Sequence, residues 1–349
     1  MVRINKWLLA GAIACSTFMV NEVQAQWGAR AGMYSEDGVQ IGVDQRVFSV
    51  LTMLNQHGFN DEPYLGAEPI KIPQFSETRV RVRGLMRRKG QVQKSFGKFI
   101  NANAQTYQWY IEQSLHVGKG PAFETTMKDD KLVRKIGTFL HDWFHEEGGS
   151  GFYDIAVKMN KNVQMDIVES INTSTAALQN TLVVGDAEDA LLEEELNPLG
   201  RVVVILAPMA PHDVIFRFEN EDVTYVVTGP FKKEGHIGQI AQVVSVAFGR
   251  TLIGAQVALQ KDALKKYQKL FQGWKGPSAQ KPSSIELLVS EMIGCAAHQL
   301  ANETEQCLLS PVTSDEATMA EVLKLKKKLS KLAVDGAPFG SILPDLLKK

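Results

Sequence analysis

Hydrophobic side chains recur at helical spacing through most of the first half of the chain. Within residues 43–58 they lie three or four positions apart, and Asp44 is a candidate N-cap for that helix. The same spacing predicts helices over residues 92–116 and 129–146, and a longer, weaker helical pattern covers residues 154–182. We therefore expect the N-terminal half to be built mainly of helices.

The pattern changes after Pro198, where three β-rich runs follow one another. The runs RVVVILAPM, DVIFRFEN and VTYVVTGP are rich in β-branched and aromatic residues, and the turn signals Pro-His-Asp and Asn-Glu-Asp separate them. Short strands that follow each other this closely predict a small antiparallel meander.

Helical patterns return after these strands. Residues 237–260 are apolar almost all round, and Arg250 is their only charged residue, which predicts a helix buried in the protein. Three further helical patterns follow, and the last of them is the basic amphipathic run ATMAEVLKLKKKLSKLA. The fold class we predict is α+β, mostly helical, with a small antiparallel sheet preceding a buried central helix.

Residues 1–25 have the pattern of a secretory signal peptide. A short basic start precedes an apolar run that ends at Val20, and Ala25 closes a small-x-small cleavage site. The apolar run is too short to span a bilayer. We expect an exported protein, either periplasmic or secreted; the alternative is a lipoprotein anchored through Cys15.

The charges of the chain nearly balance, with 38 Lys and Arg against 39 Asp and Glu. Such a balance gives no overall attraction for nucleic acid, and no later apolar stretch predicts a transmembrane segment. Locally, residues 80–94 are basic, as either a solvated face or an anion-binding patch, and residues 186–197 are acidic. Once the signal peptide is removed, Cys295 and Cys307 remain, either as a disulfide or as two buried thiols.

The stretch HDWFH, residues 141–145, has the spacing of a zinc site. A helical His-x-x-x-His puts His141 and His145 on one face, and the acidic residue after the first histidine could act as a general base. The helical wheel places both histidines opposite the apolar stripe and in line with Arg134, on a face that water reaches. No third ligand follows at a compact spacing, and Glu169 is the nearest distant option. A metal held by these two histidines and Glu169 is therefore our second choice.

The order of motifs along the chain resembles a known family. VDQRVFSVLTMLNQHG contains a Val-Asp-x-Arg helix motif, SLHVGKGPAFETT contains Pro-x-Phe, and residues 201–302 run from strands to one helix and then to a helix with a glutamate. Over residues 40–302 this order resembles an exported bacterial family of unknown function that is related to zincin-like (HExxH-type) metallopeptidases. The resemblance implies a zincin-like core over residues 198–305, between a helical N-terminal region (26–197) and a C-terminal helical tail (306–349).

The resemblance also implies where a metal motif would lie. The family's His-Glu-Phe-Gly-His falls on VAFGR, so Val246 and Arg250 stand in place of the histidines and Ala247 in place of the general base. The glutamate that would be the third ligand aligns with Glu291. Valine and alanine cannot ligate zinc and arginine repels it, so we expect no catalytic residue and no cofactor, with zinc as the alternative.

An ion pair between Arg250 and Glu291 would replace the metal, because a buried arginine needs a partner. The alternative is that Arg250 reaches the surface and Glu291 faces water.

These expectations favour a protein that is not an enzyme. The chain would be a catalytically inactive metallopeptidase-like protein that binds a peptide or protein partner in a groove beside residues 223–228 and the Val246 helix. The alternatives are an active zinc-dependent hydrolase that uses His141 and His145, and a structural envelope protein.

Overall fold

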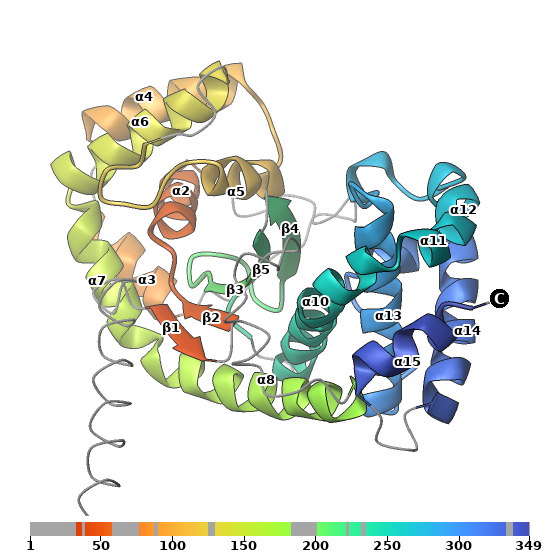
Figure 1. Ribbon diagram of the computed structural model, residues 1–349. Coiled ribbons are helices and arrows are strands. Elements are labelled where there is room, and N and C mark those ends of the chain that lie inside the picture. The colour runs from red at the N-terminus through yellow and green to blue at the C-terminus, as the bar shows by residue number, and fades with distance from the viewer. Residues whose placement is uncertain are drawn as a thin grey trace, which may run out of the picture.

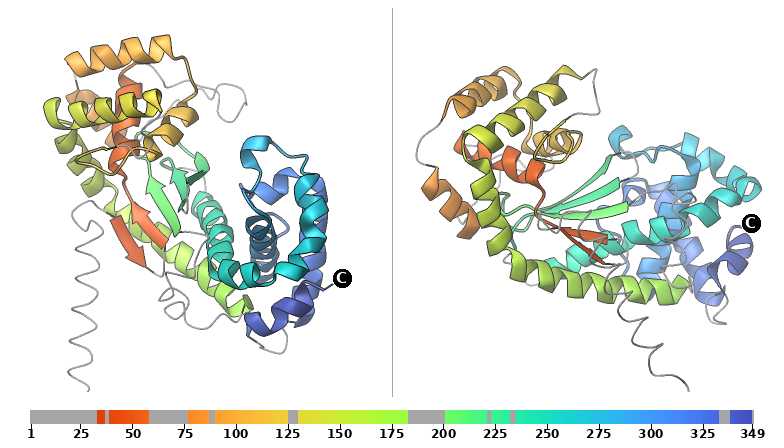
Figure 2. Two further views of the ribbon diagram at one scale, coloured as in Figure 1. Left: turned by 45° about the horizontal axis from the view of Figure 1, so that its top comes forward. Right: turned by 60° about the vertical axis from the view of Figure 1, so that its left-hand side comes forward.

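The computed structural model describes residues 33–36, 39–57, 77–86, 90–124, 130–182, 201–220, 223–231, 235–332 and 338–348. The predicted signal peptide, Cys15 and the acidic segment 186–197 lie outside these residues. Two groups of helices lie on either side of a small sheet, and the long helix α8 (Lys161–Leu182) runs along the sheet from one group to the other (Figure 1, Figure 2).

The N-terminal group is helical, as the apolar spacing predicts, but two of the expected helices are each divided in two. Asn103 and Asn160 end α4 and α7, and each donates its side-chain N–H to the carbonyl four residues earlier, at 2.9 and 2.8 Å. A side chain that competes for backbone hydrogen bonds stops a helix even where the apolar spacing continues. The helices of this group that precede α8 are α2 (Gln45–Gln56), α3 (Glu77–Leu85), α4 (Gln91–Ala102), α5 (Tyr107–Leu115), α6 (Lys131–Glu146) and α7 (Gly149–Met159).

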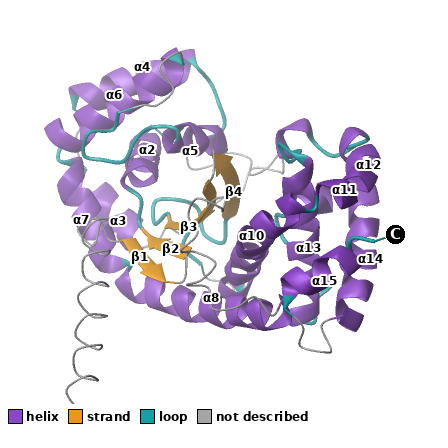
Figure 3. Cartoon of the chain, viewed as in Figure 1, coloured by secondary structure: helices purple, strands orange, loops and turns teal. Residues whose placement is uncertain are grey.

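The sheet is mixed, which corrects the predicted antiparallel meander. Its strands, drawn in orange in Figure 3, are β1 (Met33–Glu36), β2 (Val39–Gly42), β3 (Arg201–Leu206), β4 (Ile215–Asn220) and β5 (Val223–Thr228). Their spatial order is β1-β2-β3-β5-β4. The β4–β5 hairpin is antiparallel as expected, but β3 pairs in parallel with both β5 and β2. The unbroken apolar run of β3 is typical of a central parallel strand that is buried on both faces.

The C-terminal group is built around α10 (His236–Leu259), which is buried as predicted. The remaining elements are α11 (Lys261–Leu264), α12 (Gln268–Gln272), α13 (Ile285–Ala301), α14 (Glu316–Leu332) and α15 (Phe339–Leu346), with short 3₁₀ turns between some of them. By length and composition α10 is the one described helix that could cross a membrane. Most of its apolar surface is buried inside the protein, as is usual for the core helix of a globular domain.

Candidate functional site

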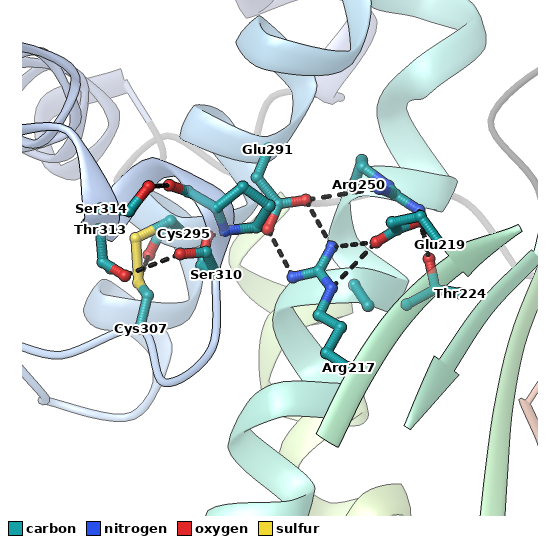
Figure 4. Close-up of polar contacts among 12 residues, drawn as sticks. Arg217, Glu219, Thr224, Arg250, Glu291, Cys295, Cys307, Ser310, Thr313 and Ser314 are labelled. Carbon is teal, nitrogen blue, oxygen red and sulfur yellow. Dashed lines mark hydrogen bonds and ion pairs between the residues drawn. A yellow bond between two sulfur atoms is a disulfide. The ribbon is translucent and has the colours of Figure 1, made fainter. Parts of the chain in front are cut away.

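The candidate site forms where α10, α13 and β4 meet. The two helices cross at close range because α13 carries a glycine there: a Cβ added to Gly294 would lie 3.1 Å from the Val246 carbonyl oxygen and from the Arg250 amide nitrogen. This crossing brings Arg250 beside Glu291, and β4 adds Arg217 from the sheet (Figure 4).

Glu291 is the centre of this cluster, and its side chain is 1% exposed. Arg217 forms two parallel contacts with it, from Nη1 to Oε1 at 2.7 Å and from Nη2 to Oε2 at 3.0 Å. Ser310 donates its hydroxyl to Oε1 at 2.7 Å, and Arg250 Nη1 lies 3.7 Å from Oε2. Both carboxylate oxygens of Glu291 are therefore held by donors of this chain.

A second glutamate, Glu219 on β4, connects the two arginines. Its carboxylate accepts Arg217 Nε at 3.0 Å, Arg250 Nη2 at 3.1 Å and the Thr224 hydroxyl at 2.8 Å. Arg250 also donates to the Thr224 hydroxyl. The side chain of Glu219 is 41% exposed, whereas those of the two arginines are at most 7% exposed, so water reaches the cluster through Glu219.

The charges in this cluster stabilise one another's ionised forms. Burial alone would raise the pKa of Glu291, but the charge and hydrogen bonds of Arg217, together with Arg250 and Ser310, hold that pKa below its ordinary value. Burial alone would lower the pKa of Arg217, but Glu291 and Glu219 raise it. Removing one partner would therefore leave an unpaired charge in the protein interior.

The structure brings together the two residues for which the sequence suggested an ion pair, Arg250 and Glu291. Neither follows the alternative, because Arg250 is 6% exposed and Glu291 is 1% exposed. Sequence reasoning missed Arg217, which is the nearer partner of Glu291. The available signal was the alternation in IFRFEN, which places Arg217 and Glu219 on the same face of β4.

The residues at the position of the implied metal motif do not fit a zinc ion. Val246 and Ala247 are fully buried and have no ligating side-chain atom, and Arg250 brings a positive charge. The oxygens of Glu291 are directed at two guanidinium groups and a hydroxyl.

The two histidines of HDWFH lie on the exposed side of α6, whereas Trp143 and Phe144 between them are buried. Ring centroids of His141 and His145 are 4.6 Å apart, but His141 Nδ1 contacts Asp142 Oδ1 at 3.1 Å and His145 Nε2 contacts the Pro121 carbonyl at 2.8 Å. Glu169 is exposed on α8. Within the part of the chain that the structure describes, no three His, Cys, Asp or Glu side chains are grouped to hold a metal, so these residues form no such group.

Cys295 and Cys307 form a disulfide with a Cα–Cα distance of 5.8 Å, which decides between the two states that the sequence left open. The bond joins α13, four residues after Glu291, to the segment that leads to Ser310 (Figure 4). It therefore fixes the loop from which Ser310 reaches the Glu291 carboxylate.

The Val-Asp-x-Arg motif has a structural role. Asp44 caps α2 by accepting the Arg46 amide at 2.8 Å and the Val47 amide at 3.3 Å. The Arg46 side chain pairs with Asp44 and donates to the carbonyls of Leu115 and Val117, at 3.0 and 2.9 Å. This motif ties the start of α2 to the end of α5.

Within the described part of the chain, residues 223–228 and Val246, beside which we expected a groove, are covered by neighbouring elements. β5 pairs with β3 on one side and with β4 on the other, and the Val246 side chain is fully buried. The outermost described strand on this side of the sheet is β4.

Comparison of the chain with protein-family models, with curated proteins and with solved structures gave no match.

Proposed function

We propose that the protein is an exported, catalytically inactive metallopeptidase-like protein that acts by binding a partner. The observation that carries this proposal is the buried cluster of Arg217, Arg250 and Glu291, at the place where the resemblance aligns the metal ligands. Two arginines at that place repel a divalent cation, and they form ion pairs with Glu291, the carboxylate that the resemblance aligns with a metal ligand.

The partner that this arrangement favours is a peptide or an unfolded protein segment in extended conformation. In the peptidases that the chain resembles, the edge strand of the sheet pairs with extended substrate backbone, and such pairing needs no metal. Here β4 is the outermost described strand beside the cluster, and it carries Arg217 and Glu219 on the face towards Arg250.

A structural envelope protein is the second candidate, and one observation favours it. The space around Val246, where the sequence suggested a groove, is filled by the protein itself. A protein without an open cleft at this place would act as a structural component of the cell envelope and would bind no peptide there.

One experiment separates these functions from each other and from a hydrolase. The exported chain, residues 26–349, is dialysed against zinc and then against buffer, and its metal content is measured. It is then mixed with fluorescently labelled β-casein, an unfolded protein, and both fluorescence anisotropy and fragment formation are followed. We expect no retained zinc, a rise in anisotropy, and no fragments.

The other outcomes identify the alternatives. Stoichiometric zinc and casein fragments, both abolished by His141→Ala with His145→Ala, would make HDWFH a catalytic centre and refute the proposal. Neither binding nor cleavage of casein would refute the binding function and favour the structural protein.

A further inference from the structure

A pocket of about 450 Å³ lies among five helices of the N-terminal group, α2, α3, α4, α6 and α7. None of the residues that line it belongs to the Arg217–Glu291 cluster. Its volume is within the range of small-molecule sites, which combine apolar walls with a few fixed polar groups.

The apolar residues that line the pocket are Leu85, Met86, Trp143 and Phe152. Trp143 and Phe152 are nearly parallel, with an interplanar angle of 20° and ring centroids 6.2 Å apart. The start of α7 packs closely on the Trp143 indole, because a Cβ on Gly149 would lie 2.5 Å from the ring. Trp143 is 1% exposed whereas Phe152 is half-buried, so Phe152 offers the aromatic surface that the apolar face of a ring-shaped ligand can reach.

The polar side of the pocket contains hydrogen-bonding groups that the described residues leave unsatisfied. Gln93 is 1% exposed, and neither its amide nitrogen nor its amide oxygen has a partner among the described residues. The same is true of the side-chain oxygen of Gln56. Buried side-chain amides are usually paired, so an unpaired one in a pocket wall points to a ligand.

Glu147 adds a carboxylate to this side. Its Oε1 accepts the Val92 amide at the start of α4, at 2.8 Å, and Oε2 accepts no hydrogen bond from the described residues. Gly90 leaves room for the carboxylate in this position, because a Cβ at position 90 would overlap Glu147 Oε1. The main chain of Gln93 is fixed as well, since its carbonyl contacts His57 Nε2 at 2.8 Å.

We infer that this pocket binds a neutral polyhydroxylated molecule, a sugar or polyol, packed against Phe152 and hydrogen-bonded to Gln93, Gln56 and Glu147. The Gln93 amide nitrogen needs an acceptor, and the side-chain oxygens of Gln93, Gln56 and Glu147 need donors. A hydroxyl group supplies both. An ammonium or guanidinium ligand has no acceptor for the amide nitrogen, and Glu147 would repel an anion.

The test is ligand-observed saturation-transfer NMR on residues 26–349 with glucose, N-acetylglucosamine and trehalose, followed by titration of those that bind. Gln93→Leu removes the amide and keeps a side chain of similar bulk. Gln91→Leu is the matched control, because Gln91 is exposed on the same helix. We expect Gln93→Leu to weaken sugar binding about tenfold or more, which corresponds to the loss of one or two hydrogen bonds, and Gln91→Leu to leave it unchanged.

Thermal unfolding distinguishes a ligand-binding role of Gln93 from a structural one. Without sugar, Gln93→Leu should unfold at the same temperature as the unmodified chain or at a higher one, because it removes an unpaired buried amide. With sugar, only the unmodified chain and Gln91→Leu should be stabilised further. If Gln93→Leu lowers the unfolding temperature and leaves sugar binding unchanged, Gln93 is structural and the inference fails.

Further probes show whether the bound sugar is free or belongs to a polymer, and they test the chemical class of the ligand. Chitotetraose distinguishes the end of a polymer from a free sugar: binding of the oligomer alone would support the inference and assign the site to polymer ends. Binding of agmatine or inorganic phosphate in place of the sugars, or of none of these probes, would overturn the inference.

Discussion

Arg217 and Glu291 are 74 positions apart in the sequence, and their side chains form a two-contact ion pair at 2.7 and 3.0 Å. Arg217 belongs to β4, the outermost described strand on its side of the sheet, and Glu291 belongs to α13 in the C-terminal group. The pair therefore couples the sheet to the helices beyond it. Because both side chains are almost fully buried, each depends on the other for its charge compensation.

Loss of the charge on Glu291 should destabilise the protein strongly. Glu291→Gln keeps the shape of the side chain but leaves Arg217 and Arg250 with one carboxylate, Glu219, for two buried charges. We expect the free energy of unfolding, measured by urea denaturation, to fall by about 3 kcal/mol. The matched control is Glu305→Gln at an exposed position, which should change it by less than about 0.5 kcal/mol. Equal effects of the two substitutions would mean that the cluster contributes little to stability.

Acidification should weaken the fold through His298. Burial lowers the pKa of His298 from 6.5 to about 4, so the unfolded chain takes up a proton as the pH falls below 6.5 while the folded protein does not. The free energy of unfolding is therefore unaffected by His298 above pH 6.5 and decreases as the pH falls from 6.5 to about 4. The total decrease is about 3 kcal/mol, because each pH unit in this window changes the free energy of unfolding by about 1.4 kcal/mol.

Urea denaturation at pH 7, 5.5 and 4 measures this dependence. His298→Gln should reduce the loss of unfolding free energy between pH 7 and pH 4 by about 3 kcal/mol. His141→Gln, at a half-exposed position, should leave this loss unchanged. The dependence contributed by Glu291 lies at lower pH, because its pKa is below the ordinary value of 4.5: the contribution is complete above pH 4.5 and is lost as the pH falls from there through the lowered pKa. An unchanged slope in His298→Gln would show that His298 takes up its proton equally in the folded and unfolded states.

The close crossing of α10 and α13 should not tolerate a methyl group. Gly294→Ala would place a Cβ 3.1 Å from backbone atoms of Val246 and Arg250, so the two helices must shift apart. We expect a loss of about 1–3 kcal/mol in the free energy of unfolding. Gly238→Ala, on the exposed side of α10 with no atom within 4 Å, should instead raise it by about 0.5–1 kcal/mol through helix propensity. A stabilising Gly294→Ala would contradict the close packing.

Reduction of the disulfide should lower stability and loosen the Ser310 contact to Glu291. The bond between Cys295 and Cys307 closes a loop with a sequence separation of 12, for which chain entropy gives about 3 kcal/mol. The measurement is the unfolding temperature with and without dithiothreitol. The double variant Cys295→Ala with Cys307→Ala should match the reduced protein and should not respond to the reductant. No change on reduction of the unmodified chain would show that packing alone holds the loop.

For the candidate site, the sequence suggested the ion pair between Arg250 and Glu291 but not Arg217, the nearer partner of Glu291. Arg250 attracted attention because it is the only charge in a long apolar helix, and the resemblance aligned Glu291 with a third metal ligand. Arg217 stood in a short alternating run like those of many surface strands. Its role depends on which helix packs across β4, and the local pattern of a strand does not contain that information.

The sequence by itself determined the helical character of the chain, the burial of α10 and the solvent-facing side of the HDWFH helix. Each of these follows from the spacing of apolar residues, which acts within one element. Only the tertiary structure decided that β3 joins β2 and β5 in parallel and that Cys295 bonds Cys307. It also decided that Arg217 completes the Glu291 cluster and that a pocket lies among the N-terminal helices. These features join segments distant in sequence, and the free energy that selects them comes from packing between elements.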